Sequence, residues 1–138
     1  NSHVLPALIR RFHEAKESSV SKISIWGTGK PRRELMHVDD LATGVLFLLG
    51  CDSPPDWINL GTGVDHSIQE IANMVKETVG FSGDILNDTS KPDGMPLKRL
   101  DVTRAKKLGW EAKISLEEGI ITAYDDFLKS LKADTARL

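Results

Sequence analysis

The strands that this sequence predicts are few and short, and this limits what the chain can form by itself. Amphipathic helices alternate with them, which favours a layered α/β or α+β domain. A parallel sheet covered on both faces needs more apolar strands than this chain of 138 residues supplies. The candidate strands are Lys22–Trp26, Arg32–Val38, Trp57–Leu60 and Asp84–Asn87. We therefore expect a segment outside this chain to contribute part of the sheet.

Apolar residues at helical spacing, together with end signals, predict the helices. Residues 67–70 and 115–118 are capping boxes that each precede an apolar face. Gly80 ends the helix after the first box, and Gly109 closes a short helix over 101–108. The predicted inward positions are Val4, Leu8, Phe12 and Ala15 in a helix from its candidate N-cap Ser2 to about Lys16, then Ile68, Ile71, Ala72, Val75 and Val79, and finally Leu116, Ile120, Tyr124, Phe127 and Leu131.

The stretch LATGVLFLLG, residues 41–50, predicts a further helix that Asp39 or Asp40 caps. Apolar residues lie on nearly all of its sides, so it needs neighbours over most of its surface. It is far shorter than the roughly 20 residues of a membrane span. We assign the two carboxylates to the helix end rather than to acid/base chemistry.

Charge and cysteine content exclude several classes of protein. Eighteen basic and twenty acidic residues give a formal charge of −2, so no general basic field attracts nucleic acid or an anionic membrane. The single cysteine, Cys51, excludes an internal disulfide and is compatible with a cytoplasmic location. Any anion site must therefore be local.

The sequence lacks the common signatures of cofactor and metal chemistry. Gly27-Thr28-Gly29 and Gly61-Thr62-Gly63 lack the third glycine of a dinucleotide fingerprint. Leu128, not lysine, stands four residues after Tyr124, so there is no Tyr-x-x-x-Lys pair. The histidines show no metal-ligand spacing, and no metal site is expected.

Three pairs of basic residues lie beside turns and breakers: Arg10 and Arg11, Arg32 and Arg33, and Lys98 and Arg99. Forked guanidinium donors and a lysine charge suit a diphosphate. Composition alone leaves open whether these residues converge on a ligand or are solvated surface charge.

Longer motifs are more specific. The stretches SHVLPALIRRFHEAK, IWGTGKPRRELMHVDDLA, NLGTGVDHSIQEIA and DTSKPDGMPLKRLDVTRAKKLGW follow one another over nearly the whole chain. Together they resemble the GDP-L-fucose synthase family of extended short-chain dehydrogenases/reductases. HVDDLA and N-x-G-T-G are typical of the superfamily, whereas SHVLPALIRRF and KPDGMPLKRLDVTR are more particular to the fucose synthases.

The resemblance implies an α/β fold and a share in a known reaction. That family uses NADPH to convert GDP-4-keto-6-deoxy-D-mannose to GDP-L-fucose by epimerisation at C3 and C5 and reduction at C4. Residues 1–138 would be its carboxy-terminal, GDP-sugar-binding portion, including an edge strand of a Rossmann sheet whose main half is absent. The cofactor would be bound mainly by that amino-terminal half, which also carries the catalytic Ser, Tyr, Lys and Cys. The chain alone is then expected to be inactive, and the full-length form to be a homodimer.

The resemblance also implies roles for six residues. His3 corresponds to the general acid of epimerisation and lies near the nicotinamide, a role that suits imidazole because it titrates near neutral pH. Arg11, Arg33 and Lys98 correspond to ligands of the GDP moiety, and Trp26 and Asp93 to further substrate contacts.

The residues are also compatible with other assignments. Without the resemblance, His3 would be a solvent-exposed residue at the start of a helix, and Trp26 would be a core residue at the end of a strand. Two alternatives to a fucose synthase are part of an epimerase or reductase that acts on a different nucleotide sugar, and a binding module without catalytic activity. The start of the chain, without methionine, indicates a fragment.

Overall fold

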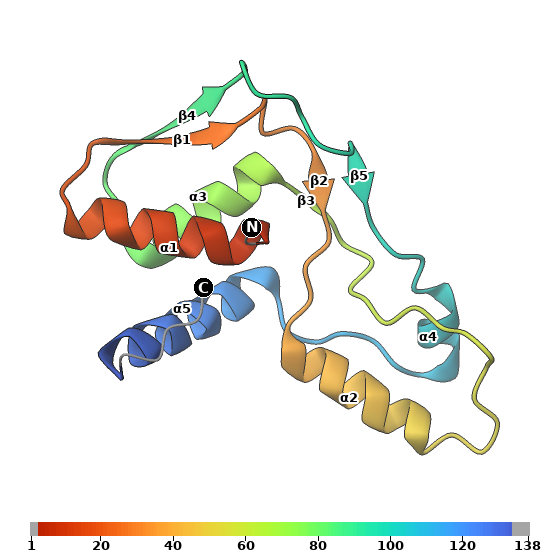
Figure 1. The fold of residues 1–138 in the computed structure, drawn as a ribbon. Coiled ribbons are helices and arrows are strands. Elements are labelled where there is room, and N and C mark those ends of the chain that lie inside the picture. Colours follow the sequence, from red (N-terminus) through yellow and green to blue (C-terminus); the bar gives the residue numbers. More distant parts are fainter. Residues whose placement is uncertain (1–2, 134–138) are drawn as a thin grey trace.

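The computed structural model describes residues 3–133. Five helices and five short strands alternate along the described chain (Figure 1). In chain order they are α1 Val4–Glu17, β1 Lys22–Trp26, β2 Arg32–Arg33, α2 Val38–Leu49, β3 His66–Ser67, α3 Ile68–Val79, β4 Asp84–Asp88, β5 Leu97–Lys98, α4 Thr103–Leu108 and α5 Leu116–Lys132. The α/β fold class is therefore confirmed. None of the described helices is long and apolar enough to cross a bilayer.

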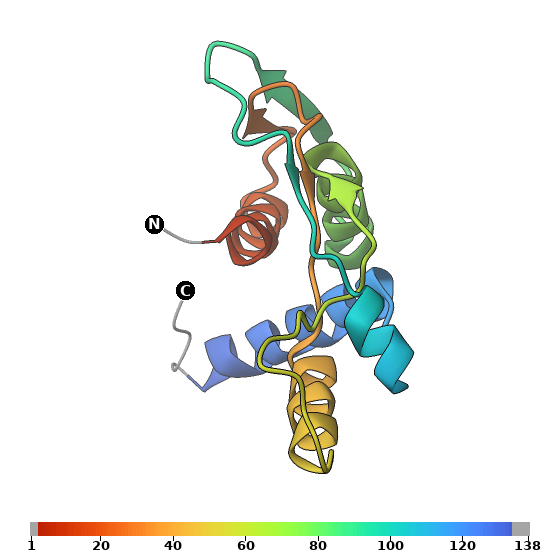
Figure 2. The same cartoon turned by 90° about the vertical axis from the view of Figure 1, so that its right-hand side faces the viewer.

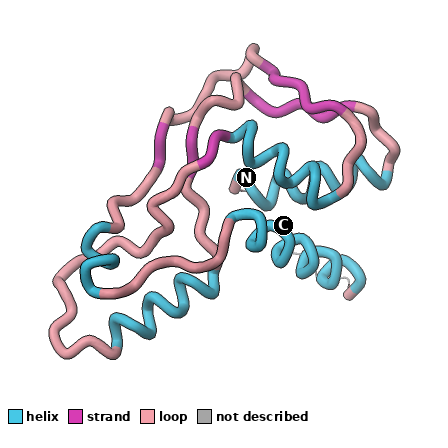
Figure 3. The backbone as a smooth tube through the Cα atoms, turned by 180° about the vertical axis from the view of Figure 1, so that it is seen from behind, coloured by secondary structure: helices cyan, strands magenta, loops and turns pink. Residues whose placement is uncertain are grey.

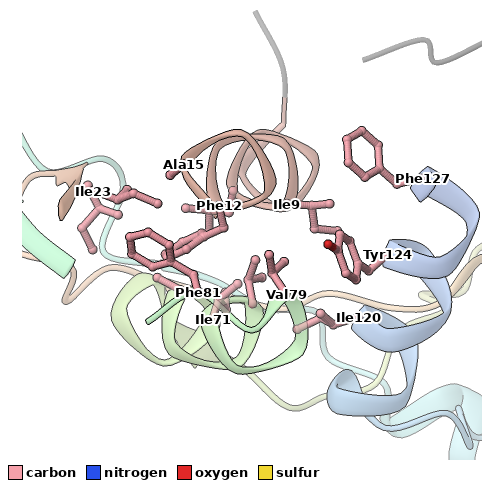
Figure 4. Close-up of a cluster of buried hydrophobic side chains, with 14 residues drawn as sticks. Ile9, Phe12, Ala15, Ile23, Ile71, Val79, Phe81, Ile120, Tyr124 and Phe127 are labelled. Carbon is pink, nitrogen blue, oxygen red and sulfur yellow. The ribbon is translucent and has the colours of Figure 1, made fainter. Parts of the chain in front are cut away.

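One hydrophobic core joins α1, α3, α5 and β1. Phe12, Ile71 and Ile120, one from each helix, are fully buried in it. Phe12 meets Phe81 edge to face, with ring centroids 5.5 Å apart, and Tyr124 and Phe127 approach α1 from α5 (Figure 4). Burying apolar surface of this kind is the main stabilising contribution to folding. The other buried members are Leu8, Ile9, Ala15, Ile23, Ile25, Ala72, Val75 and Val79.

Two long segments run side by side in the same direction through both small sheets. β1 pairs with β4 in parallel, ending at the partners Trp26 and Asp88. β2 then pairs with β5 in parallel, where Arg32 faces Leu97. Between the two ladders lie the turn 27–31 and the loop 89–96. β3 adds an antiparallel neighbour on the other side of β2, giving the order β3-β2-β5.

α2 lies at the opposite end of the molecule from β1 and β4 (Figures 1 and 2). Its buried residues are Asp40 and Gly44, while Leu46 is 68% and Leu49 78% exposed. The predicted burial on most sides is therefore not met among residues 3–133. Gly44 is needed where it stands, because an added Cβ would lie 2.9 Å from the ring of Trp110.

Asp40 connects α2 to the start of α5. Asp40 is only 4% exposed, and its carboxylate accepts hydrogen bonds from the backbone N–H groups of Lys113 and Ile114 at 3.1 and 2.9 Å. The prediction that an aspartate caps α2 is wrong, because the side chain of His37 accepts the bond from Asp39 N. A carboxylate turned toward α5 is not available to its own helix end.

Other predicted elements are confirmed or need correction. Both capping boxes form, and Gly80 ends α3 with φ +74°. β2 is much shorter than predicted, and residues 57–60 form no strand, since no described segment pairs with them and they lie in the long loop between α2 and β3 (Figure 3). Ser2, the candidate cap of the first helix, lies outside the described residues, and His3 occupies the N-cap position.

An ion-pair cluster fixes β2 to the segment before β3. The guanidinium of Arg32 donates to the carboxylate of Asp65 and also lies 3.5 Å from Glu70. Arg99 donates to the other oxygen of Asp65 at 3.0 Å. The hydrogen bond from Arg32 and the nearby positive charges lower the pKa of Asp65. Arg32 and Arg99 therefore have a structural role, as opposed to their neighbours Arg33 and Lys98.

Replacing Asp40 with asparagine should destabilise the chain. Asn has one acceptor oxygen where Asp has two, and its amide N–H₂ would face a buried backbone N–H. An unpaired buried donor costs about 1–3 kcal/mol, so Asp40→Asn should lower the free energy of unfolding by that amount in urea titrations. The exposed neighbour Asp39 provides the control, because Asp39→Asn should change the free energy of unfolding by less than about 0.5 kcal/mol. Equal effects of the two variants would contradict the role of Asp40.

The Asp65 cluster should make stability depend on acid pH. Because the pKa of Asp65 is lower in the folded chain, its stabilising contribution is complete above the ordinary aspartate pKa of 3.8 and is lost as pH falls through the lower folded value. Asp65→Asn should therefore reduce the difference between the free energies of unfolding at pH 7 and pH 3. An unchanged difference in the variant would show that the cluster contributes nothing.

Candidate functional site

Arg33 and Lys98 are brought together by the parallel pairing of β2 and β5. The two residues are direct partners in the register, and Glu34 N donates to the carbonyl of Lys98 at 3.0 Å. Side chains of paired residues in neighbouring strands lie on the same face of a sheet, and successive residues alternate between faces. Arg33 and Lys98 therefore share one face, and Arg32 belongs to the other.

The loop 91–96 lies against Arg33. The Arg33 guanidinium donates to the backbone carbonyl of Met95 at 2.7 Å. A Cβ added at Gly94 would lie 3.1 Å from the same guanidinium, so the loop backbone passes close to it. The side chain of Arg33 is thus held by the loop, with a further bond to the carbonyl of Arg32 at 2.6 Å.

Asp93 binds the turn between the two ladders. Its carboxylate accepts one hydrogen bond from Thr28 N at 2.8 Å and one from the Thr28 hydroxyl at 2.7 Å. These bonds from Thr28 lower the pKa of Asp93. Gly27 allows the close approach, because its φ is +74° and an added Cβ would meet the Asp93 carboxylate at 2.2 Å.

Trp26 lies at the end of β1, immediately before this turn. Trp26 is 71% exposed, so it does not belong to the core formed by residues 3–133. The ammonium group of Lys91 lies 6.0 Å from the centre of its ring. An exposed aromatic face beside a cation is suited to stacking on a planar group.

Glu34 organises the sheet next to Arg33, and the sequence analysis missed it. One carboxylate oxygen accepts from Thr62 N and Gly63 N at 2.6 and 2.9 Å, and the other accepts from Leu100 N at 2.6 Å. An added Cβ at Gly61 would lie 2.4 Å from Glu34. Gly61 of the N-x-G-T-G motif therefore leaves room for the Glu34 carboxylate, which no local pattern around Glu34 indicated.

A cleft of about 550 Å³ opens beside Lys98. Apolar side chains from three segments line it, together with the backbone of Gly61. Met95 is 60% exposed at its edge. The lining residues include Met36, Leu60, Met95, Leu97 and Leu100. A cationic group at the edge of a largely apolar cleft is a common arrangement in sites for small molecules.

The structure does not bring Arg11 and His3 into direct contact with the Arg33–Lys98 pair. Arg11 lies on the exposed side of α1 and donates to the backbone carbonyl of Ser24 in β1. His3 is exposed at the N-cap of α1, with extended backbone geometry, and its carbonyl accepts from Ala7 N at 3.1 Å. Both residues therefore belong to α1 and its N-cap, apart from the β2–β5 pair.

The residues present do not fit the pyrophosphate cradle of a dinucleotide cofactor. Such a cradle needs unengaged backbone N–H groups in a glycine-rich turn. In both Gly-Thr-Gly turns the N–H of the threonine already donates to a carboxylate, Asp93 for Thr28 and Glu34 for Thr62. Among residues 3–133 no group of three His, Cys, Asp or Glu side chains is arranged to hold a metal ion.

Sequence comparison relates the chain to one group of enzymes. It is 48% identical over 131 residues to a probable GDP-L-fucose synthase 1 of Oryza sativa subsp. japonica, covering 95% of this chain and 40% of the relative. It is 45% identical over 139 residues to the GDP-L-fucose synthase of Escherichia coli strain K12, covering 94% and 43%. The chain thus spans about two fifths of the length of these curated relatives. Residues 1–61 match the NAD dependent epimerase/dehydratase family.

Solved structures agree with this relationship. A GDP-mannoheptose C4 reductase from Campylobacter jejuni with NADP bound is 40% identical, with a TM-score of 0.77 over 90% of this chain and 44% of that one. A GDP-L-fucose synthetase from Naegleria fowleri is 25% identical, with a TM-score of 0.84 over 98% and 42%. The resemblance found in the sequence motifs is confirmed. The chain is similar to the carboxy-terminal part of the GDP-L-fucose synthases, and its α/β fold matches about two fifths of these solved structures.

Proposed function

We propose that this chain is the substrate-binding part of an enzyme that converts GDP-4-keto-6-deoxy-D-mannose to GDP-L-fucose with NADPH. The observation that carries the proposal is the direct pairing of Arg33 with Lys98 in a chain this similar to GDP-L-fucose synthases. Two adjacent cations on one face provide forked and point-charge donors for the oxygens of a diphosphate.

The neighbouring residues extend this site. Trp26 offers an exposed aromatic face, and Asp93 fixes the loop that holds Arg33. Arg11 reaches the same ligand from α1 in this proposal, which requires its guanidinium to leave the carbonyl of Ser24. The diphosphate is a strongly charged acceptor, so it competes well with a neutral carbonyl for an arginine.

His3 is proposed as the general acid of epimerisation, close to the nicotinamide. It stands at the exposed start of α1, where no described part of the chain buries the ring. Imidazole exchanges protons near neutral pH, and epimerisation requires a proton to be returned to the carbon next to the ketone.

The remaining parts of the reaction belong outside this chain. Both Gly-Thr-Gly turns are occupied by carboxylates, so the cofactor is bound by other residues and the chain alone is inactive. We assign a cytoplasmic location and a homodimeric full-length enzyme to the same proposal.

A second candidate is an enzyme acting on a different GDP-linked keto sugar. It is favoured by the 40% identity to the GDP-mannoheptose reductase and by the 36% identity to a GDP-L-colitose synthase of Yersinia pseudotuberculosis. Turnover of GDP-4-keto-6-deoxy-D-mannose compared with other GDP-keto sugars distinguishes the two. Tighter binding of UDP or dTDP than of GDP would exclude both.

The diphosphate ligands are tested in a full-length enzyme that carries this chain. We call it the joined enzyme; it links the amino-terminal part of the E. coli relative to residues 1–138. Arg11→Ala, Arg33→Ala and Lys98→Ala should each weaken GDP binding about 10- to 100-fold in calorimetric titrations, since a hydrogen bond to a charged group contributes roughly 1.5–3 kcal/mol. Arg10→Ala is the matched control and should bind GDP as the parent does. Equal, small losses in all four variants would reduce these residues to surface charge.

His3→Gln in the joined enzyme should impair epimerisation much more than binding. Removing a general acid typically costs about 10²–10⁴-fold in rate, whereas the GDP contacts remain. Exchange of the C3 and C5 hydrogens with deuterated solvent, followed by NMR, measures the step directly. His13→Gln is the control on the same helix. Unchanged exchange in His3→Gln would return His3 to a solvent-exposed residue at a helix start.

A further inference from the structure

The Thr28–Asp93 contact lies where the two parallel ladders are interrupted. Backbone pairing ends at Trp26 and Asp88 and resumes at Arg32 and Leu97. Between these points the turn and the loop separate, and Asp93 joins them with two short hydrogen bonds to Thr28.

The turn is the fixed side of this contact. Its Gly29 and Pro31 carbonyls accept bonds from Gln69 N and Ile68 N, at 3.0 and 2.9 Å, in the first turn of α3. The loop 91–96 is exposed along its whole length. Its backbone is held at its two ends, where Lys91 N donates to the Asp88 carbonyl at 3.2 Å and the Pro96 carbonyl accepts from Arg32 N at 2.7 Å. Between these ends, Asp93 provides the side-chain contact to the turn. Asp93 therefore connects the loop to the turn, and through the turn to α3.

Three consecutive loop residues connect the contact to Arg33. Asp93 binds Thr28, the Gly94 backbone passes close to the Arg33 guanidinium, and the Met95 carbonyl accepts from it. A movement of the loop would therefore displace one of the two carbonyls that orient Arg33, leaving only that of Arg32. The Arg33 side chain has no ion-pair partner among the described residues that could replace it.

The chemistry of Asp93 also argues against contact with a diphosphate. An ionised carboxylate accepts hydrogen bonds and donates none, and so does a phosphate oxygen. Like charges repel, which adds to the conflict. Both oxygens of Asp93 already accept from Thr28.

We propose that Asp93 and Thr28 are positioning residues that act as one unit, holding the loop 91–96 so that Arg33 is oriented toward the diphosphate of the substrate. This inference rests on the proposed function and assigns Thr28 a role that the sequence motifs did not indicate. It also changes the role of Asp93 from a substrate contact to a residue acting through Arg33.

A double-mutant cycle in the joined enzyme tests the unit, with GDP as the probe. Asp93→Ala should weaken GDP binding about 5- to 10-fold, and Thr28→Val by a smaller factor, because Thr28 N still donates. In the Asp93→Ala background, Thr28→Val should cause no further loss. Thr28→Ser keeps the hydroxyl, so this variant should bind GDP with the affinity of the parent joined enzyme. The KM for the GDP-keto sugar should rise in parallel, with kcat unchanged.

Two glycines provide an independent test of the same contact. Gly27→Ala and Gly109→Ala both place a side chain at positive φ, +74° and +102°, so both carry a backbone cost. Only at Gly27 does the new Cβ meet Asp93, while nothing lies within 4 Å at Gly109. Gly27→Ala should weaken GDP binding, and Gly109→Ala should leave it unchanged even where both lower the melting temperature.

The outcomes separate this inference from the proposed function. Loss of GDP binding in the parent joined enzyme would overturn both. Parent binding with additive losses for Thr28→Val and Asp93→Ala, or with no loss for either, would overturn the positioning role alone. If Asp93→Ala weakens GDP binding while Thr28→Ser and Thr28→Val weaken it equally, the threonine hydroxyl plays no part, and this outcome too would overturn the unit of Asp93 and Thr28.

Discussion

The parallel course of residues 22–33 and 84–98 is the constraint on which the rest of the structure depends. It pairs β1 with β4, then β2 with β5, and so aligns Arg33 with Lys98. The core of α1, α3 and α5 supports β1 from one side, with Phe12, Ile71 and Ile120 fully buried. Two carboxylates hold the second sheet together. Glu34 in the segment after β2 accepts from the backbone before β3 and after β5, and Asp65 before β3 accepts from Arg32 and Arg99. The candidate site is thus held by a short sheet that side chains stabilise.

Local signals in the sequence were sufficient for the existence of the helices and for most of the core, although Leu131, predicted to point inward, is 40% exposed. The capping boxes at Ser67 and Ser115 form as predicted, and the faces containing Phe12, Val75 and Tyr124 are buried. These features depend on residues three or four apart, which a single sequence displays. The strand Lys22–Trp26 was predictable from a pattern that is also local but has a period of two, since its alternating residues Ile23 and Ile25 are buried.

Predictions that depended on distant partners were less successful. Residues 57–60 were expected to be a strand, but a strand needs a paired neighbour and no described segment supplies one. Asp40 was assigned to its own helix end, whereas its partners lie more than seventy residues away at the start of α5. Glu34 and Thr28 gave no signal, because their roles exist only once the turn, the loop and the sheet are assembled.

The candidate site shows the same division. Resemblance to a family singled out Arg33, Lys98, Trp26 and Asp93, and the fold brings them to one region through β1, β2, β5 and the loop between. Periodicity could not have separated Arg33 from Arg32, which differ only in the face of β2 that each occupies. The ion pairs of Arg32 with Asp65 and Glu70 make that difference chemical as well as geometric.

The most direct test is a crystal structure of the joined enzyme with GDP bound. We expect the diphosphate to lie within hydrogen-bonding distance of the Arg33 guanidinium and the Lys98 ammonium group, with Asp93 still bound to Thr28. GDP bound elsewhere, with Arg33 and Lys98 both in solvent, would contradict this expectation.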